Sequence, residues 1–438
     1  MNSQASPLSA EEIYDRRLFG RIGMRCVPVL LAAFVISYLD RVNVGFAAIT
    51  ATKDLHMSSS AFGLGTGLFF LSYFLFEAPS NYLLEKIGAR IWLACIMVCC
   101  GLVAAGMFYV TAATFGPVRF LLGAVEAGLF PGVVLYLTYW FPRRYRARYI
   151  SLFAVGIPLS SVVGAPISGL LLGLNGFLGF KGWQWLYVLE AIPAVIIGVV
   201  IWLILADSPE KAAWLSPEER AYVKDAIARE QAAHPDKGGH GNWLDQFRLL
   251  ADPRVIIFSL VFFGTGVPSY GLAFWLPQIV KGFGASNIET GLISALPFLC
   301  GSIAMVVWGR HSDRTGERVW HTLAAALVAA AGLIACVWIT SPWLALASLC
   351  VSAAGVYAVK GPFLSAVSES FSDKTAAVGI ALVSSIGNLS GFAAPYMVGL
   401  IKDATGQFTP ALLALGLCSL VGGLFMLLRR SAVRAVAA

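Results

Sequence analysis

The sequence predicts an all-α integral membrane protein with twelve transmembrane helices arranged as two six-helix halves. The chain has 438 residues, of which 58% are hydrophobic and only 13% are charged, whereas a soluble domain carries about 25% charged residues. Apolar stretches long enough to cross a bilayer, about 20 residues each, follow one another along most of the chain. The bilayer is therefore the expected environment of this protein.

The predicted spans are joined by short loops, with one exception. They cover residues 24–49, 60–84, 90–111, 115–138, 147–172, 185–206, 254–280, 289–309, 320–340, 343–367, 376–400 and 409–428. After the sixth span, residues 207–253 form a long polar segment. We therefore expect an N-terminal half at 24–206, a C-terminal half at 254–429, and polar ends at 1–23 and 430–438.

The long polar segment contains the start signal of a helix. Ser216 is a favourable N-cap, Pro217 suits the first helical position, and acidic residues fill the first turn of "SPEERAYVKDAIAREQAA". We expect a short surface helix here, in a linker between the two halves.

Basic residues gather in alternate loops, and this sets the expected orientation. "DRRLFGRIGMR", "EKIGAR", "PRRYRAR" and "GRHSDRTGER" fall on one side of the membrane, while the other side carries scattered single lysines. By the positive-inside rule the first side is cytoplasmic and holds both termini. The net charge of +7 thus reflects topology and does not indicate nucleic-acid binding. With no apolar signal-peptide core at its start, the chain is expected to be a multi-pass protein of the cytoplasmic (inner) membrane.

Cysteine and histidine residues show no metal-ligand spacing. The eight cysteines lie in or beside apolar spans and are interpreted as packing residues. The five histidines are scattered along the chain: His56, His234, His240, His311 and His321. Because the sequence also lacks a nucleophile motif, we expect neither an enzyme nor a bound cofactor.

An internal repeat supports the two-half arrangement. "NYLLEKIGARIW" follows the second span, and "GRHSDRTGERVW" follows the eighth, six spans later. Both place an acid, a base and a Gly in a short loop before a base and a Trp, and the Gly allows a tight turn. Parallel six-span halves with a site between them are typical of one transporter architecture. The chain resembles the major facilitator superfamily, whose loop signature the second copy matches more closely than the first.

Longer strings narrow the resemblance to one branch. "YLDRVNVGFA", "FLFEAPSNYLLEKIGAR", "RFLLGAVEAGLFPG" and "WQWLYVLEAIPAVIIG" together resemble the anion:cation symporter family, and "GLAFWLPQIVKGFG" is most like its bacterial tartrate- and phthalate-type members. That family moves organic acids, commonly with protons. The resemblance therefore implies a transporter of a small organic anion.

Two neighbouring charges lie in the first span, where a charge costs roughly 2.5–3.5 kcal/mol on insertion scales. Asp40 and Arg41 point about 100° apart on a helix. One interpretation is an ion-pair network that fixes helix packing. The other, which the family resemblance favours, assigns Arg41 to the substrate carboxylate, which its planar fork matches, and Asp40 to a proton.

Arg119 and Glu126 are seven residues apart in the fourth span, hence on one helix face. The family resemblance implies an anion contact for Arg119 and a coupling carboxylate for Glu126. A carboxyl group in a low-dielectric cavity can take up a proton and release it when a cation approaches. A structural network with Asp40 is the alternative.

Lys360 lies within the tenth span, next to Gly361 and Pro362, which break or loosen a helix. No acid lies near it in that span, so we interpret it as a second carboxylate anchor, with a structural partner elsewhere as the alternative. The expected hydroxyl and carboxylate partners are Asn388, Tyr73, Tyr270 and Trp275.

Four further charged residues are weaker candidates. Glu77 and Glu190 lie nearer to span ends and are interpreted as ties between helix ends. Glu369 and Arg148 are expected at the interface, where long side chains reach the headgroups.

The expected function is a proton-coupled symporter that imports a small organic anion by alternating access. Three cations in the pathway favour a dicarboxylate such as tartrate or a phthalate-like acid. The alternatives are a sugar-acid symporter, an anion exchanger and a non-transporting sensor. We expect lipid, protons and the anion as the partners of a monomer.

Overall fold

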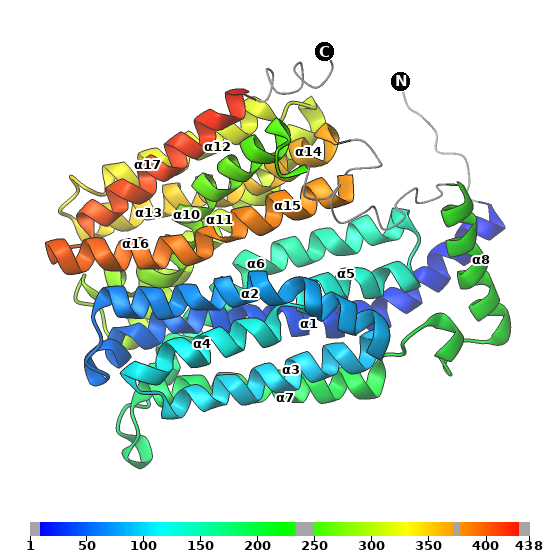
Figure 1. Cartoon of the computed structure of the whole chain (residues 1–438), viewed down its shortest axis with the longest axis horizontal. Coiled ribbons are helices and arrows are strands. Elements are labelled where there is room, and N and C mark those ends of the chain that lie inside the picture. The colour runs from blue at the N-terminus through cyan, green and yellow to red at the C-terminus, as the bar shows by residue number, and fades with distance from the viewer. Residues whose placement is uncertain (1–8, 234–248, 372–375, 429–438) are drawn as a thin grey trace.

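The computed structural model describes residues 9–233, 249–371 and 376–428. All regular elements within these ranges are helices, and Figure 1 shows them as a bundle of long, roughly aligned rods. Ten helical segments are long and apolar enough to cross a membrane, and two shorter apolar helices cover Gly156–Leu172 and Val319–Ala335. Together they correspond to the twelve predicted spans.

The helices preceding the linker are α1 (Ala10–Asp54), α2 (Ser59–Ile87), α3 (Ala89–Gly106), α4 (Ala112–Glu126), α5 (Leu129–Trp140), α6 (Arg143–Leu172) and α7 (Gly182–Ile204). We call these helices the N-terminal half. The surface helix expected from the start signal at Ser216 is α8 (Pro217–Ala233).

The helices that follow are α10 (Pro253–Lys281), α11 (Asn287–Thr315), α12 (Val319–Ala335), α13 (Pro342–Ala358), α14 (Lys360–Ser370), α15 (Ala376–Asn388), α16 (Ser390–Thr405) and α17 (Thr409–Phe425). We call these helices the C-terminal half.

α1 begins much earlier than the first predicted span. Ser9 caps it, and its side chain and that of Glu12 form a reciprocal capping box. The added turns carry Asp15, which is buried and accepts hydrogen bonds from Tyr145 (2.5 Å) and Tyr222 of α8 (3.3 Å) and pairs with Arg144. Contacts with α6 and α8 thus stabilise a helical segment that apolar content could not predict.

Three predicted spans are each built from two helices. The breaks fall at 127–128 between α4 and α5, at Val359 between α13 and α14, and at Leu389 between α15 and α16. Pro362 lacks the N–H that would bond to the Ala358 carbonyl, which explains the second break. Each break directly follows or precedes a predicted site residue.

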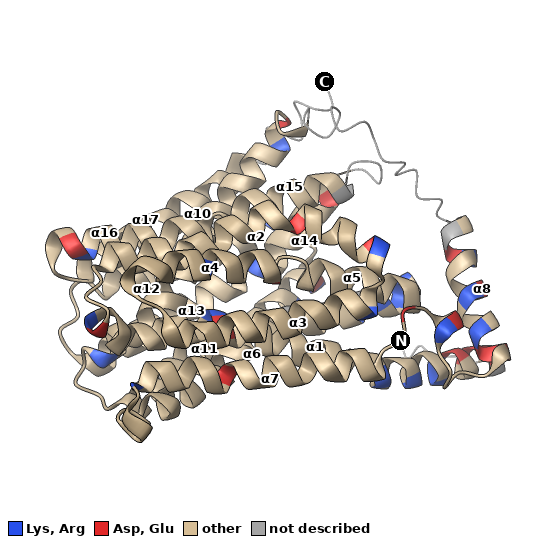
Figure 2. Cartoon of the chain, turned by 60° about the horizontal axis from the view of Figure 1, so that its bottom comes forward, with Lys and Arg blue, Asp and Glu red and all other residues tan. Residues whose placement is uncertain are grey.

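Charged residues gather at one end of the bundle. Figure 2 shows Lys, Arg, Asp and Glu clustered around α8 and the start of α1. We call this end, which the loop charges assign to the cytoplasm, the predicted cytoplasmic end, and the other the opposite end.

The two halves pack tightly at the opposite end. A Cβ on Gly63 of α2 would lie 2.2 Å from the Pro395 carbonyl oxygen of α16, and one on Gly169 of α6 would lie 2.7 Å from the Asn287 carbonyl oxygen of α11. The Asp403 carboxylate of α16 also accepts hydrogen bonds from two backbone N–H groups at the start of α2, at 2.9 and 2.8 Å. In Figure 1 the ribbons of the halves diverge toward the predicted cytoplasmic end. The halves are thus joined at the opposite end.

Candidate functional site

An ion pair joins α1 to the end of α4 inside the N-terminal half. Arg41 donates to one oxygen of Glu126, from Nε at 2.9 Å and from Nη2 at 2.5 Å. The Glu126 side chain is 1% exposed and that of Arg41 is 16% exposed. Sequence reasoning paired Glu126 with Arg119 on one helix face, whereas the structure directs it to Arg41. Glu126 is the last residue of α4, directly before the break at 127–128.

Aromatic rings surround the Arg41 guanidinium. The rings of Tyr38, Phe69 and Tyr73 have their centroids 5.0, 5.2 and 5.1 Å from its Cζ. Ring faces attract a cation and partly offset its loss of water. Tyr73, a predicted hydroxyl partner of the substrate, thus lies beside Arg41. Tyr38 and Phe69 were missed because an aromatic residue in an apolar span carries no signal of function.

Arg119 is a buried cation without a hydrogen bond. It is fully buried, and none of its three guanidinium nitrogens has a partner among the described residues. Its Cζ lies 4.9 Å from the Phe69 centroid, so the same ring contacts both arginines. Arg119 also interacts electrostatically with Tyr187, whose hydroxyl likewise lacks a partner. Glu126 and Asp40 also interact with it electrostatically, but neither accepts a hydrogen bond from it. A buried charge without hydrogen bonds is costly, so this position favours an anion.

Asp40 and Glu190 are two buried carboxyl groups that both interact with the side chain of Asn43. Asp40 is 3% exposed and accepts a hydrogen bond of 3.2 Å from Asn43 Nδ2. Glu190, from α7, is 5% exposed and accepts one of 2.8 Å from Ser168 of α6. Sequence reasoning took Glu190 for a tie between helix ends. The structure places it two turns inside α7, where its bond to Ser168 joins α7 to α6 and where it interacts electrostatically with Asn43.

In the C-terminal half, Lys360 begins α14 directly after the break at Val359. Its Nζ lies 4.7 Å from the centroid of the Tyr357 ring, and no described carboxylate forms an ion pair with it. The interruption expected around Gly361 and Pro362 is therefore present, slightly earlier in the chain.

Tyr270 connects the halves. Its hydroxyl donates to Asn388 Oδ1 at 3.4 Å, and its ring lies 4.6 Å from that of Phe70 in α2. Tyr270 also interacts electrostatically with Arg41 across the halves. Asn388 ends α15, so its amide lies at a helix break, as Lys360 and Glu126 do. Arg41, Tyr73, Tyr270 and Asn388 thus form one connected group.

Trp275 and Glu77 form no hydrogen bond or ion pair with this group among the described residues. Trp275 is buried at the opposite end, with its ring 5.5 Å from Phe62 and 5.6 Å from Phe408. Glu77 is half-buried in α2, and no described residue forms an ion pair with it. Their expected roles remain predictions.

Comparison with known proteins agrees with this architecture. The family model described as "Major Facilitator Superfamily" matches residues 30–395. The chain belongs to the major facilitator superfamily. It is 47% identical over 425 residues to a protein of Agrobacterium vitis named "Putative tartrate transporter", covering 96% of this chain and 93% of the relative.

Two further proteins to which the chain is similar share less of its sequence. A protein of Acinetobacter baumannii named "Quinolone resistance transporter" is 35% identical, with 93% of this chain and 94% of the relative covered. The inward-open structure of the xylose transporter XylE from E. coli shares the fold, with a TM-score of 0.71 at 16% identity, covering 93% of this chain and 95% of that one. The superfamily consists of transporters, so the chain is not an enzyme.

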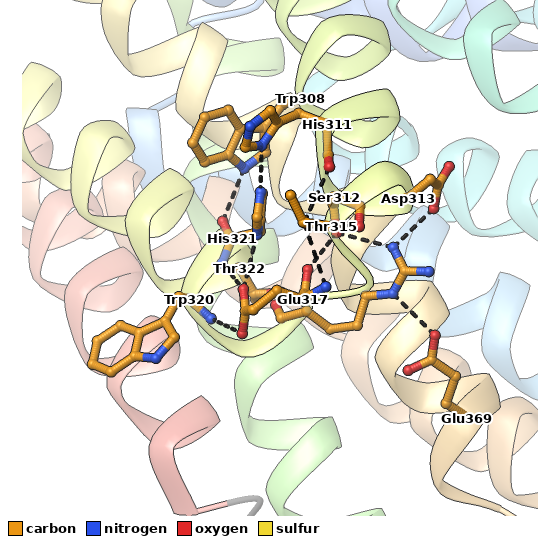
Figure 3. Close-up of polar contacts among 11 residues, drawn as sticks. Trp308, His311, Ser312, Asp313, Thr315, Glu317, Trp320, His321, Thr322 and Glu369 are labelled. Atoms are coloured by element: carbon orange, nitrogen blue, oxygen red, sulfur yellow. Dashed lines mark hydrogen bonds and ion pairs between the residues drawn. The ribbon is translucent and has the colours of Figure 1, made fainter. Parts of the chain in front are cut away.

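The superfamily loop signature forms a polar network between α11 and α12 (Figure 3). Arg318 pairs with Asp313 at 2.8 Å and with Glu369 of α14 at 3.0 Å. Glu369, which was expected at the membrane interface, ties α14 to this loop. Gly316, at the turn, has a φ of +66°, and Gly88 in the first copy has a φ of +98°. Both copies therefore use Gly for the tight turn that the sequence predicts.

Proposed function

We propose that the protein is a proton-coupled symporter that imports a small organic anion by alternating access. The observation that carries the proposal is the fully buried Arg119, whose three nitrogens lack hydrogen-bond acceptors among the described residues. A carboxylate reaching this guanidinium would supply the missing acceptors in a charge-assisted, two-pronged geometry. Tyr187, beside it, offers a free hydroxyl for the same anion.

Glu126 supports the coupling to protons. Glu126 forms an ion pair with Arg41. A substrate carboxylate that binds Arg41 therefore competes with the Glu126 carboxylate for the same guanidinium. Protonation of Glu126 breaks the pair and frees Arg41 for the substrate. Release of the substrate and of the proton on the cytoplasmic side lets Glu126 ionise and pair with Arg41 again. Asp40 is the second coupling carboxylate, and protons are the coupling ion.

Lys360 supports a substrate with two negative charges. It lies on the other half of the molecule and has no described carboxylate partner. One carboxylate bound in the N-terminal half and a second at Lys360 would draw the halves together, as alternating access requires. Tyr270 and Asn388 supply hydroxyl and amide partners between them. We therefore propose a dicarboxylate such as tartrate or a phthalate-like acid, and the name of the Agrobacterium vitis relative supports this choice.

The proposal includes the setting of the protein. Basic loops and α8 gather at one end of the bundle, which supports placing that end and both termini in the cytoplasm. We propose a monomer in the cytoplasmic membrane. A sugar-acid symporter is the second candidate, since such a substrate needs only one cationic anchor.

Uptake into proteoliposomes tests the proposal. Labelled tartrate, phthalate, galactonate, glucuronate and a quinolone would be supplied with and without an inward proton gradient. We expect tartrate or phthalate to accumulate, and only with the gradient. Gradient-independent exchange would indicate an anion exchanger, galactonate or glucuronate alone would indicate the sugar-acid symporter, and binding without uptake would indicate a sensor. Uptake of the quinolone alone would reject the organic-anion class.

A further inference from the structure

Three arginines form a row on the exposed side of α1, at the predicted cytoplasmic end. Arg17, Arg21 and Arg25 follow one another at intervals of four residues, so they lie on successive turns of one side of the helix. All three are exposed. Arg21 pairs with Glu219 of α8, whereas no described acid forms an ion pair with Arg17 or Arg25. Figure 2 shows that basic residues gather in this part of the molecule.

A second segment of the chain completes a hollow beside this row. The hollow has a volume of about 410 Å³ and is lined by Arg21, Met24, Arg25 and Trp214. Trp214 belongs to the segment between α7 and α8, and the centroid of its ring lies 4.9 Å from the Arg25 Cζ. The same ring stacks on the fully buried Trp140 of α5, at 5.8 Å and 6°. Tertiary packing thus fixes the ring on which Arg25 rests, which a charge that only sets the topology does not need.

The donors of the hollow suit a phosphate group. Its described lining contains no acidic residue. Arg25 has no hydrogen-bond acceptor among the described residues, and the side chain of Arg21 is 54% exposed although one of its nitrogens binds Glu219. A guanidinium carries five N–H donors in a planar fork, which binds phosphate oxygens in pairs. The hollow therefore offers free donors of two cations to one anionic group.

Exposed apolar surface adjoins the hollow. Met24, in its lining, is 82% exposed and begins the first predicted span. On the same turn of α1, Cys26 Sγ lies 3.7 Å from the hydroxyl of Tyr136, which donates to the Ala206 carbonyl at 3.0 Å. These contacts bring the end of α7 beside this turn, and Leu203 in the last turn of α7 is 67% exposed. A ligand with an anionic head and apolar chains would match both surfaces.

We infer that this hollow binds the phosphate of an anionic phospholipid, whose acyl chains lie along the exposed apolar surface of α1 and α7. Basic pockets at the cytoplasmic ends of membrane helices suit such headgroups, and Trp side chains favour the same depth. A lipid bound here contacts both α1 and the segment that leads into α8. It would therefore hold the start of the linker against the N-terminal half. The inference is independent of the transported substrate.

Native mass spectrometry of the purified full-length protein in a neutral detergent tests the ligand class. The probes are phosphatidylglycerol, phosphatidylcholine of the same acyl chains, and inorganic phosphate as a competitor. We expect phosphatidylglycerol to be retained, phosphatidylcholine to be retained far less, and excess inorganic phosphate to leave the bound lipid in place. Equal retention of the two lipids would reject a site for an anionic headgroup. Displacement by inorganic phosphate would show a site for a soluble anion and would reject the lipid.

Three variants test the location of the site. Arg25→Gln should lower the affinity for phosphatidylglycerol about fivefold, whereas Arg229→Gln, which removes the same charge from an exposed position on α8, should leave it unchanged. Trp214→Leu keeps every charge and should also weaken binding. Equal affinities of the two arginine variants would show that only the overall charge attracts lipid, and full affinity in Trp214→Leu would reject the hollow as the site. If Trp214→Leu fails to fold, the comparison of the arginine variants decides alone.

Discussion

The two halves share an architecture and differ sharply in buried charge. The N-terminal half buries two arginines and three carboxyl groups around Phe69 and Asn43. The C-terminal half holds Lys360 beside Tyr357, together with the Tyr270–Asn388 pair. The first half combines buried cations with carboxyl groups, whereas no described carboxylate forms an ion pair with Lys360 in the second. The difference suggests that coupling belongs to one half and that the other mainly closes on the substrate.

Glu126→Gln should have the largest effect, because it would remove the exchangeable partner of Arg41. Each coupled proton sustains about a tenfold accumulation per pH unit of gradient. We expect gradient-driven accumulation in proteoliposomes to vanish, while substrate exchange is reduced less. Glu218→Gln, which changes an exposed carboxylate on α8, is the control. Accumulation that survives in Glu126→Gln would contradict the assignment of coupling to the N-terminal half.

Arg119→Lys should weaken substrate binding by roughly ten- to a hundredfold, the cost of about 1.5–3 kcal/mol for a lost charge-assisted hydrogen bond. An ammonium keeps the charge and loses the planar fork that binds a carboxylate with two bonds. Titration of the purified protein with labelled substrate would measure this loss of affinity. Arg318→Lys, in the surface loop of the C-terminal half, should leave the affinity unchanged. Equal affinities of Arg119→Lys and the wild type would remove Arg119 from the binding site.

Lys360→Gln should weaken the binding of a dicarboxylate by about tenfold, and leave that of a monocarboxylate of matched size nearly unchanged. The reason is that only the dicarboxylate has a second charge for Lys360 to bind. Competition of both acids against one labelled substrate would show the selectivity. An equal loss for both acids would mean that Lys360 supports the structure or the coupling, and the dicarboxylate inference would fall.

Glu317→Gln should have the smallest effect, on stability alone. Partial burial opposes ionisation, but hydrogen bonds from His321 and from backbone N–H groups prevail and hold the pKa of Glu317 below its ordinary value. Its contribution is therefore present above the ordinary Glu pKa of about 4.3 and lost as the pH falls below it. Because the side chain is 34% exposed, we expect a loss of only about 0.5–1 kcal/mol at pH 7. Thermal unfolding at pH 7 and pH 4 should show the gap between variant and wild type narrowing in acid.

The sequence was a good guide wherever hydrophobicity or local turn chemistry decides the structure. The predicted span 254–280 is α10 (Pro253–Lys281), and the capping signal at Ser216 and Pro217 predicted α8. It was a poorer guide to Ala10, where α1 begins, because long-range contacts of Asp15 stabilise that turn. Breaks inside predicted spans were only partly foreseen. Pro362 gave a signal, while the break beside Asn388 did not.

The sequence by itself determined which charged residues lie inside the membrane. An ionisable residue within an apolar span can be recognised from the sequence alone, whatever its depth in the bilayer. Only the tertiary structure decided how they are matched. Glu126 pairs with Arg41 of another helix, Arg119 has no acceptor among the described residues, and Glu190 accepts from Ser168 of another helix, although nothing in the spacing along one helix distinguishes these pairings. The physical reason is that a buried charge is stabilised by whatever lies within a few ångströms of it. Those neighbours come from helices far apart in the chain, placed by packing and by the breaks in α4–α5, α13–α14 and α15–α16.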